Sequence, residues 1–190
     1  MTSITSVDLF CGAGGLTHGF VLEGIPVVAG IDMDPACRFP YESNNTARFV
    51  ERDISTITAA DLRKLFGDAD IRILAGCAPC QPFSTYAQRY SLNGDGKWEL
   101  LCEFARLAKA TRPDVITMEN VPTVARHAVF HGFVDTLKRL DYHVWYDIVD
   151  SSKYGVPQAR RRMVLLASKL GECKIIEPTH TNPKTVRQAI

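Results

Sequence analysis

A glycine-rich turn near the start of the chain constrains the fold more than any other feature. Residues 4–10 have the pattern of a buried strand, residues 11–15 are Cys-Gly-Ala-Gly-Gly, and residues 16–22 have a helical pattern that ends at Gly24. Strand, glycine turn and helix form the first unit of a Rossmann-like fold, in which glycines let the backbone approach a ligand and helix N-terminal amides face it. Thr17 stands where the dinucleotide fingerprint G-x-G-x-x-G has its third glycine, which favours a smaller nucleoside cofactor. A turn that only joins strand to helix is the alternative.

An acidic pair follows the second predicted strand, residues 26–31. Rossmann-like domains bind ribose hydroxyls with an acid at this strand tip, so Asp32 is the candidate ribose ligand. Asp34 has a simpler interpretation as the N-cap of a helix that begins at Pro35.

A candidate nucleophile follows the central predicted strand, residues 71–75. The next residues are Gly-Cys-Ala-Pro-Cys-Gln-Pro-Phe-Ser, and the two prolines that flank the Cys80–Gln81 pair exclude a helix there. The Cys80 thiol is thus held at the strand end where open α/β sheets bind ligands, and it can attack if its pKa is lowered or a base takes its proton. Cys77 and Cys80 also form a C-x-x-C pair, as in redox and zinc sites, but no second such pair follows. We interpret Cys77 as a buried small hydrophobic residue.

Charged residues lie at the ends of two further predicted strands. Residues 114–118 lead directly to Glu119, a candidate proton donor if its surroundings are apolar and a solvated acid if they are not. Arg160, Arg161 and Arg162 enter the last predicted strand, so Arg160 and Arg162 should point to one face and Arg161 to the other.

The remaining pattern completes an α/β chain. Helices are predicted at residues 58–66, 99–110 and 123–140, and residues 142–150 alternate apolar and polar side chains as a half-buried strand does. Residues 85–97 are polar and glycine-containing, which is typical of a closing lid or of an ordinary surface hairpin.

Composition limits the classes of protein that this chain can belong to. Its 190 residues fit one domain, and a net charge of +1 argues against a generally basic nucleic-acid-binding coat. Six cysteines indicate reduced thiols in a cytoplasm, and we expect neither a signal peptide nor a membrane span. His127 and His131 are four apart, but no third ligand is indicated, so we expect no metal.

Four motifs together resemble the DNA (cytosine-5) methyltransferases. Residues 8–15 are similar to the family's cofactor loop, residues 79–81 to its catalytic Pro-Cys-Gln, residues 119–121 to its Glu-Asn-Val, and residues 158–162 to its Gln-x-Arg-x-Arg. Each motif alone is weak, but four in the same order make chance agreement remote. The resemblance implies a Rossmann-like S-adenosylmethionine-dependent methyltransferase fold of the α/β class, with a mostly parallel sheet and helices on both faces.

The resemblance also implies a role for each site residue. Cys80 would attack carbon 6 of a flipped cytosine, Glu119 would bond ring nitrogen 3 and the amino group, and Arg162 with Arg160 would hold the carbonyl oxygen. S-adenosylmethionine would be the methyl donor and S-adenosylhomocysteine the product. The residues implied to contact S-adenosylmethionine are Phe10, Gly12, Ala13, Gly14, Gly15, Leu16, Asp32, Met33, Asp53, Ile54, Pro79 and Leu100. The implied substrate contacts are Ala78, Gln81, Ser84, Asn120, Val121 and Gln158.

The family pattern continues beyond what this chain contains. The family has a target-recognition domain and a final cofactor motif, and neither is found in the 190 residues. We therefore expect a catalytic and cofactor-binding domain at 1–176, an exit segment at 177–190, and the missing parts in a second subunit or a longer chain. Double-stranded DNA is the expected partner, in a bacterial cytoplasm and a restriction-modification system. Methylation of tRNA and an inactive cofactor-binding fragment are the alternatives.

Overall fold

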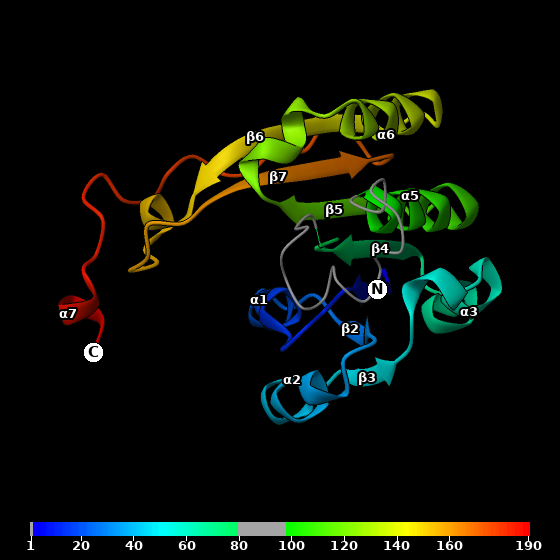
Figure 1. Ribbon diagram of the computed structural model, residues 1–190, viewed down its shortest axis with the longest axis horizontal. Helices are drawn as coiled ribbons and strands as arrows, with labels where there is room; N and C mark the ends of the chain where they lie inside the picture. Colours follow the sequence, from blue (N-terminus) through cyan, green and yellow to red (C-terminus); the bar gives the residue numbers. More distant parts are fainter. Residues whose placement is uncertain (1, 80–97) are drawn as a thin grey trace.

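The computed structural model describes residues 2–79 and 98–190, and these form a layered α/β structure around a seven-stranded sheet (Figure 1). The strand order is β3-β2-β1-β4-β5-β7-β6. In chain order the strands are β1 (Ile4–Leu9), β2 (Val27–Asp32), β3 (Arg48–Glu51), β4 (Ile71–Gly76), β5 (Val115–Asn120), β6 (His143–Asp150) and β7 (Arg161–Ser168).

Strand direction brings one end of each of the seven strands to the same edge of the sheet. Strands β1 to β5 are parallel, and β7 is antiparallel to both β5 and β6, so β6 runs in the same direction as β1 to β5. The carboxyl ends of these six strands therefore share an edge with the amino end of β7. The predicted, mostly parallel sheet is confirmed, and its reversed strand carries the arginine motif to the ligand-binding edge of the fold.

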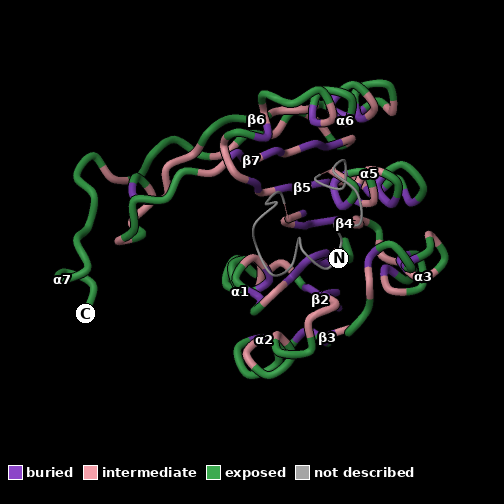
Figure 2. Tube along the Cα trace, in the orientation of Figure 1, coloured by how far each residue is buried: buried purple, intermediate pink, exposed green. Residues whose placement is uncertain are grey.

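Helices cover both faces of the sheet, as predicted. One group of helices packs beside β2 and β3 and consists of α1 (Gly15–Leu22) and α2 (Arg38–Asn44). In the other group α5 (Glu99–Thr111) contacts α3 (Ala59–Phe66) on one side and α6 (Ala128–Arg139) on the other. The chain order explains this division, because right-handed crossovers change face when the winding direction reverses after β3. Buried segments lie along the strands between these layers (Figure 2).

Two apolar clusters hold the layers together. The larger contains the predicted apolar face of α5, including Phe104 and Leu107, which are fully buried, and the Phe104 ring lies 5.8 Å from that of Phe133 in α6. The smaller lies by β2 and β3 and includes Tyr41 and Phe49. Each such side chain contributes about 1.5–3 kcal/mol of transfer free energy when buried.

Two local predictions were wrong. Instead of one helix over 123–140 there is a 3-10 turn, η4 (Pro122–Arg126), and then α6, because His127 has extended backbone angles (φ −101°, ψ 139°) and its ring packs against Trp98. Strand β6 does not alternate strictly between buried and exposed residues, since it is an edge strand with only β7 beside it.

The chain leaves the sheet after β7 and ends in a mostly exposed segment with a short helix, α7 (Val186–Ala189), away from the sheet (Figures 1 and 2). Two hydrogen bonds join its start to the 3-10 turn η5 (Ser151–Tyr154): the Tyr154 hydroxyl donates to the Ile176 carbonyl at 3.0 Å, and the His180 amide to the Lys153 carbonyl at 3.0 Å. Among the described residues, every helix is too short or too polar to cross a bilayer.

Candidate active site

The glycine turn after β1 adopts backbone angles that most residues avoid. Phe10, Gly12 and Gly14 have φ values of 58°, 51° and 90°. A Cβ on Gly14 would lie 2.8 Å from the buried Tyr41 ring and 2.4 Å from Asn45 Nδ2, so only glycine fits there. Among residues 2–79 and 98–190, nothing lies within 4 Å of a Cβ added to Gly12 or Gly15, so this part of the chain leaves space for a ligand at the turn.

Asp32 connects this turn to the tip of β2. Its Oδ2 accepts a hydrogen bond from the Gly12 amide at 2.9 Å, and its Oδ1 accepts one from the Asp34 amide at 2.9 Å. Burial raises the pKa of Asp32, and these amide hydrogen bonds oppose that rise. The Asp32 carboxylate thus holds the glycine turn against the tip of β2, the position at which the sequence predicts the ribose site. Asp34 caps the 3-10 turn η1 (Pro35–Cys37), as predicted.

A buried acid beneath the turn was missed by the sequence interpretation. Asp8 in β1 is 1% exposed, and its Oδ2 accepts a hydrogen bond from Thr17 Oγ1 at 2.8 Å. Thr17 Oγ1 also lies 3.1 Å from the Tyr41 hydroxyl. Thr17, which stands in place of the third fingerprint glycine, is therefore hydrogen-bonded to the first strand through Asp8. The sequence signal was an acid between two apolar residues, Val7 and Leu9, within a predicted strand.

We expect Asp8 to make stability depend on pH. Burial raises its pKa from 3.8 to about 7, so between these values the folded state keeps a proton that the unfolded state loses. This contribution is fully present below the unfolded pKa and is lost as pH rises through the folded pKa, by about 2–3 kcal/mol from about pH 5 to about pH 8. Asp8→Asn should remove that slope, measured by urea unfolding at several pH values. Parallel pH profiles for the two proteins would contradict the assignment.

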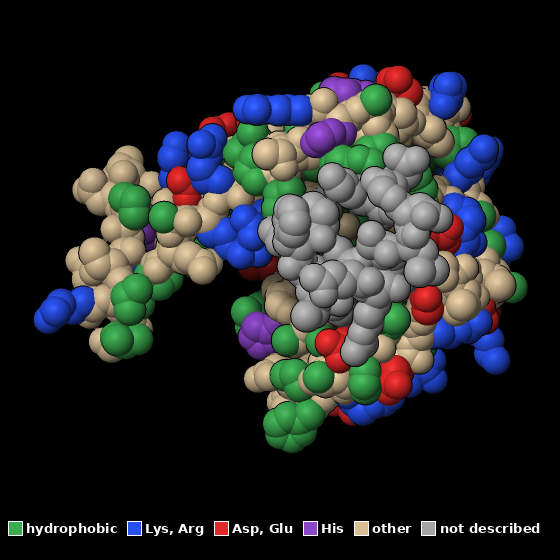
Figure 3. Space-filling view, viewed as in Figure 1, with side chains coloured by type: hydrophobic (Ala, Val, Ile, Leu, Met, Phe, Trp, Pro, Cys, Tyr) green, Lys and Arg blue, Asp and Glu red, His purple; other side chains and the backbone are tan. Residues whose placement is uncertain are grey.

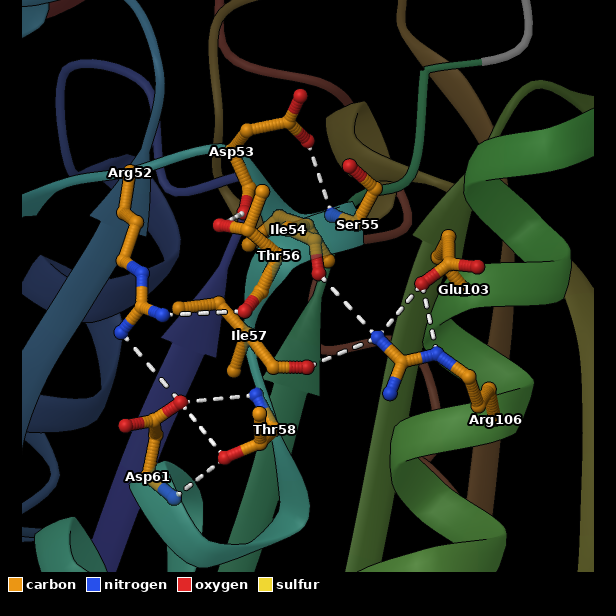
Figure 4. A network of polar contacts seen from close by, with 10 residues as sticks. All are labelled: Arg52, Asp53, Ile54, Ser55, Thr56, Ile57, Thr58, Asp61, Glu103 and Arg106. Atoms are coloured by element: carbon orange, nitrogen blue, oxygen red, sulfur yellow. Dashed lines mark hydrogen bonds and ion pairs between the residues drawn. The ribbon is translucent and has the colours of Figure 1, made fainter.

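The segment after β3 forms a braced loop (Figure 4). Asp53 caps the 3-10 turn η2 (Ile54–Thr56) by accepting from the Ser55 amide at 2.9 Å. Arg106 of α5 donates from Nη2 to the Ile57 and Ile54 carbonyls at 2.9 and 3.4 Å, and it pairs with Glu103. Arg106 thus ties Ile54, one of the predicted cofactor contacts, to the helix that carries Leu100, and Asp53, another predicted contact, caps the turn that begins at Ile54.

Glu119 at the end of β5 is the charged centre of the edge. Its Oε1 lies 2.8 Å from Arg162 Nε and 3.5 Å from Arg160 Nη2. Glu119 pairs with Val164 of the antiparallel β7, so residues two and four positions before Val164 share its face. The predicted shared face of Arg160 and Arg162 is thus confirmed.

One sequence interpretation needs correction here, and one open question is answered. Cys77 is not simply a buried hydrophobic residue, since its Sγ lies 2.9 Å from Glu119 Oε2 and donates to it. The sequence left the surroundings of Glu119 open, and the structure shows that two guanidinium groups face its carboxylate and that its side chain is 26% exposed. The sequence alone could not give these contacts, because they depend on how β4, β5 and β7 are arranged in the sheet.

The Ala78 carbonyl and the Asn120 amide bond each other. Asn120 Nδ2 donates to the Ala78 oxygen at 2.9 Å, and Asn120 Oδ1 accepts from the Val121 amide at 2.7 Å. Asn120 is 3% exposed, so this pair holds Ala78, which precedes the predicted catalytic Pro-Cys-Gln, against β5. Contact of these three residues with a substrate stays a prediction.

The other predicted site residues divide into placed and undescribed ones. The structure describes Ala13 as exposed, Leu16, Met33 and Pro79 as half-buried, Leu100 as buried, and Gln158 as exposed. Cys80, Gln81, Ser84 and the predicted lid at 85–97 lie outside the described residues.

The sheet order, the glycine turn and the acidic strand tips define an α/β protein of the Rossmann-like methyltransferase class. Residues 4–190 match the family of C-5 cytosine-specific DNA methylases, and the chain belongs to that family.

Similar proteins agree with this assignment. The chain is 51% identical over 189 residues to the type II methylase M.HgiDII of Herpetosiphon aurantiacus, covering 97% of this chain and 53% of that protein. It is 34% identical over 201 residues to the type II methyltransferase M.XorII of Xanthomonas oryzae, covering 100% and 46%. A solved structure of a putative DNA modification methyltransferase from an Escherichia coli prophage superposes with a TM-score of 0.81 at 25% identity, covering 98% and 54%. The chain thus spans about half the length of the relatives it matches.

Proposed function

We propose that this chain carries the catalytic and cofactor-binding part of a DNA (cytosine-5) methyltransferase of a type II restriction-modification system. The observation that supports this best is the Glu119 carboxylate, held by Arg162 and Arg160 beside the strand end from which Pro79 and Cys80 continue. Family membership and the type II relatives support the same activity.

The glycine turn suits S-adenosylmethionine. Gly12 and Gly15 leave space for its amino-acid end, Asp32 offers a carboxylate near the ribose position, and the braced loop offers Asp53 and Ile54 to the adenine. When bound, this cofactor supplies an activated methyl group. A mononucleoside fits the turn better than a dinucleotide does, because Thr17 occupies the third glycine position and is tied to Asp8.

The protein's own residues would do the remaining chemistry. The Cys80 thiolate adds to carbon 6 of cytosine, and this makes carbon 5 nucleophilic. Glu119 bonds the ring-nitrogen and amino edge of the base, and Arg162 stabilises charge on the carbonyl side. Carbon 5 then takes the methyl group, and loss of its proton to a base together with departure of the Cys80 thiolate re-forms the double bond between carbons 5 and 6 and releases 5-methylcytosine.

The basic end of the sheet is suited to phosphates. Figure 3 shows Lys and Arg side chains gathered where β6 ends and β7 begins, and Lys153, Arg160 and Arg161 are exposed there. Such a local patch attracts a nucleic-acid backbone even though the net charge is only +1.

Methyl transfer from tritiated S-adenosylmethionine tests the proposal. The complete enzyme should label DNA and leave tRNA unlabelled, and Cys80→Ala should abolish labelling while cofactor affinity stays within about twofold, because Cys80 acts in chemistry rather than in binding. Cys102→Ala, a change at an exposed cysteine, is the matched control. Labelling of tRNA alone would replace DNA as the substrate, and a Cys80→Ala variant with parental activity would refute the mechanism.

A further inference from the structure

Cys77 contacts the proposed acid directly. The two residues are 42 positions apart, yet Cys77 Sγ lies 2.9 Å from Glu119 Oε2. Parallel pairing of β4 with β5 sets Gly76 opposite Met118, so the residue after each meets its counterpart at the strand ends. Within the described ranges, Cys77 is the one donor recorded for Oε2, whereas both arginines bond Oε1.

The thiol is held in place as a donor. Burial, followed by the neighbouring Glu119 and Asp8 carboxylates, raises the pKa of Cys77, so the sulfur keeps its proton at neutral pH. The Cys77 amide donates to the Leu9 carbonyl at 3.3 Å, and the next residue, Ala78, is bonded by Asn120. The backbone that carries the Cys77 side chain is therefore held in place, and its S–H group has one defined acceptor, Glu119 Oε2.

We propose that Cys77 is a positioning residue. Its hydrogen bond orients Glu119 Oε2 toward the incoming base, and this bond breaks when the base binds to Oε2. A thiol is a weak donor, so the amino group of a cytosine can displace it at little cost. The arginines fix one carboxylate oxygen and the thiol fixes the other, which leaves the carboxylate one orientation. This inference rests on the proposed function, because it assigns Glu119 to the base.

Two substitutions separate hydrogen bonding from packing. Cys77→Ala removes the donor, and we expect kcat for DNA methylation to fall by about five- to tenfold, the scale of one weak bond to a charged group, while the Kd for S-adenosylmethionine changes less than about twofold. Cys77→Ser keeps a donor and should retain kcat within about threefold of the parent. Cys102→Ala is again the control. A parental kcat in Cys77→Ala, or equal loss in Cys77→Ala and Cys77→Ser, would overturn the proposal.

An infrared measurement tests the contact without any activity. The S–H stretching band of Cys77, obtained as the difference between parent and Cys77→Ala spectra, should lie at the low frequency of a strongly bonded thiol. Glu119→Gln should move it toward the free-thiol frequency, because a neutral amide accepts more weakly than a carboxylate. If the S–H frequency is the same in the parent and in Glu119→Gln, the contact between Cys77 and Glu119 is contradicted. If the band responds but the parent methylates no DNA, the contact stands and the proposed function fails, so the two failures are distinguishable.

Discussion

Arg162→Ala should reduce methyl transfer by about 10²- to 10³-fold, the cost of removing one preorganised charge-stabilising donor from an active site. Arg162 Nε makes the shorter contact with Glu119 Oε1, 2.8 Å against 3.5 Å for Arg160, and its side chain is 24% rather than 44% exposed. Loss of Arg162 therefore removes the guanidinium nearest the Glu119 carboxylate and leaves Oε1 only the longer Arg160 contact among the described residues.

Neighbouring arginines provide the controls for this prediction. Arg160→Ala should cost about tenfold or less, because its exposed guanidinium is better screened. Arg161 lies on the opposite face of β7, so Arg161→Ala should affect DNA affinity rather than kcat. The measurement is steady-state methyl transfer with separate kcat and KM values. Equal losses at all three positions would mean that the motif acts only as a patch of charge.

Gly14→Ala should destabilise the fold by about 2–5 kcal/mol. A side chain at φ 90° costs about 1–2 kcal/mol, and overpacking against the buried Tyr41 ring adds about 1–3 kcal/mol. Urea unfolding at constant pH measures the change.

The adjacent glycine offers a matched control. Gly15 begins α1, and its added Cβ meets no described residue within 4 Å, so Gly15→Ala should preserve or slightly raise stability, by up to about 1 kcal/mol. The same Cβ would enter the space assigned to S-adenosylmethionine, so calorimetry should show weaker cofactor binding. Equal stability of the two variants would contradict the turn geometry, and unchanged affinity in Gly15→Ala would contradict the cofactor position.

Features that depend on one stretch of chain were predictable from the sequence. The glycine turn, the acid at the tip of β2 and the shared face of Arg160 and Arg162 all follow from local periodicity. The common location of Asp32 and Glu119 was predictable too, because parallel strands bring their carboxyl ends to one edge of the sheet.

Features that depend on strand order were not predictable. The Cys77–Glu119 contact requires β4 and β5 to be neighbours in a given register, and the sequence does not state that register. The Asp8–Thr17 bond likewise crosses from a strand to the following helix inside the core. At His127 the backbone turns where helical periodicity continues, because packing against Trp98 overrides local preference.

In the proposed reaction, Cys80 forms a covalent bond with cytosine. DNA in which every cytosine carries fluorine at carbon 5 tests this without knowledge of the target sequence, because the fluorine cannot leave as the proton does and the adduct persists. With S-adenosylmethionine present, we expect a protein–DNA adduct that survives denaturation and that fragment-ion mass spectrometry assigns to the Cys80 side chain. An adduct on Cys77, or no adduct while the same preparation methylates ordinary DNA, would contradict the proposed mechanism.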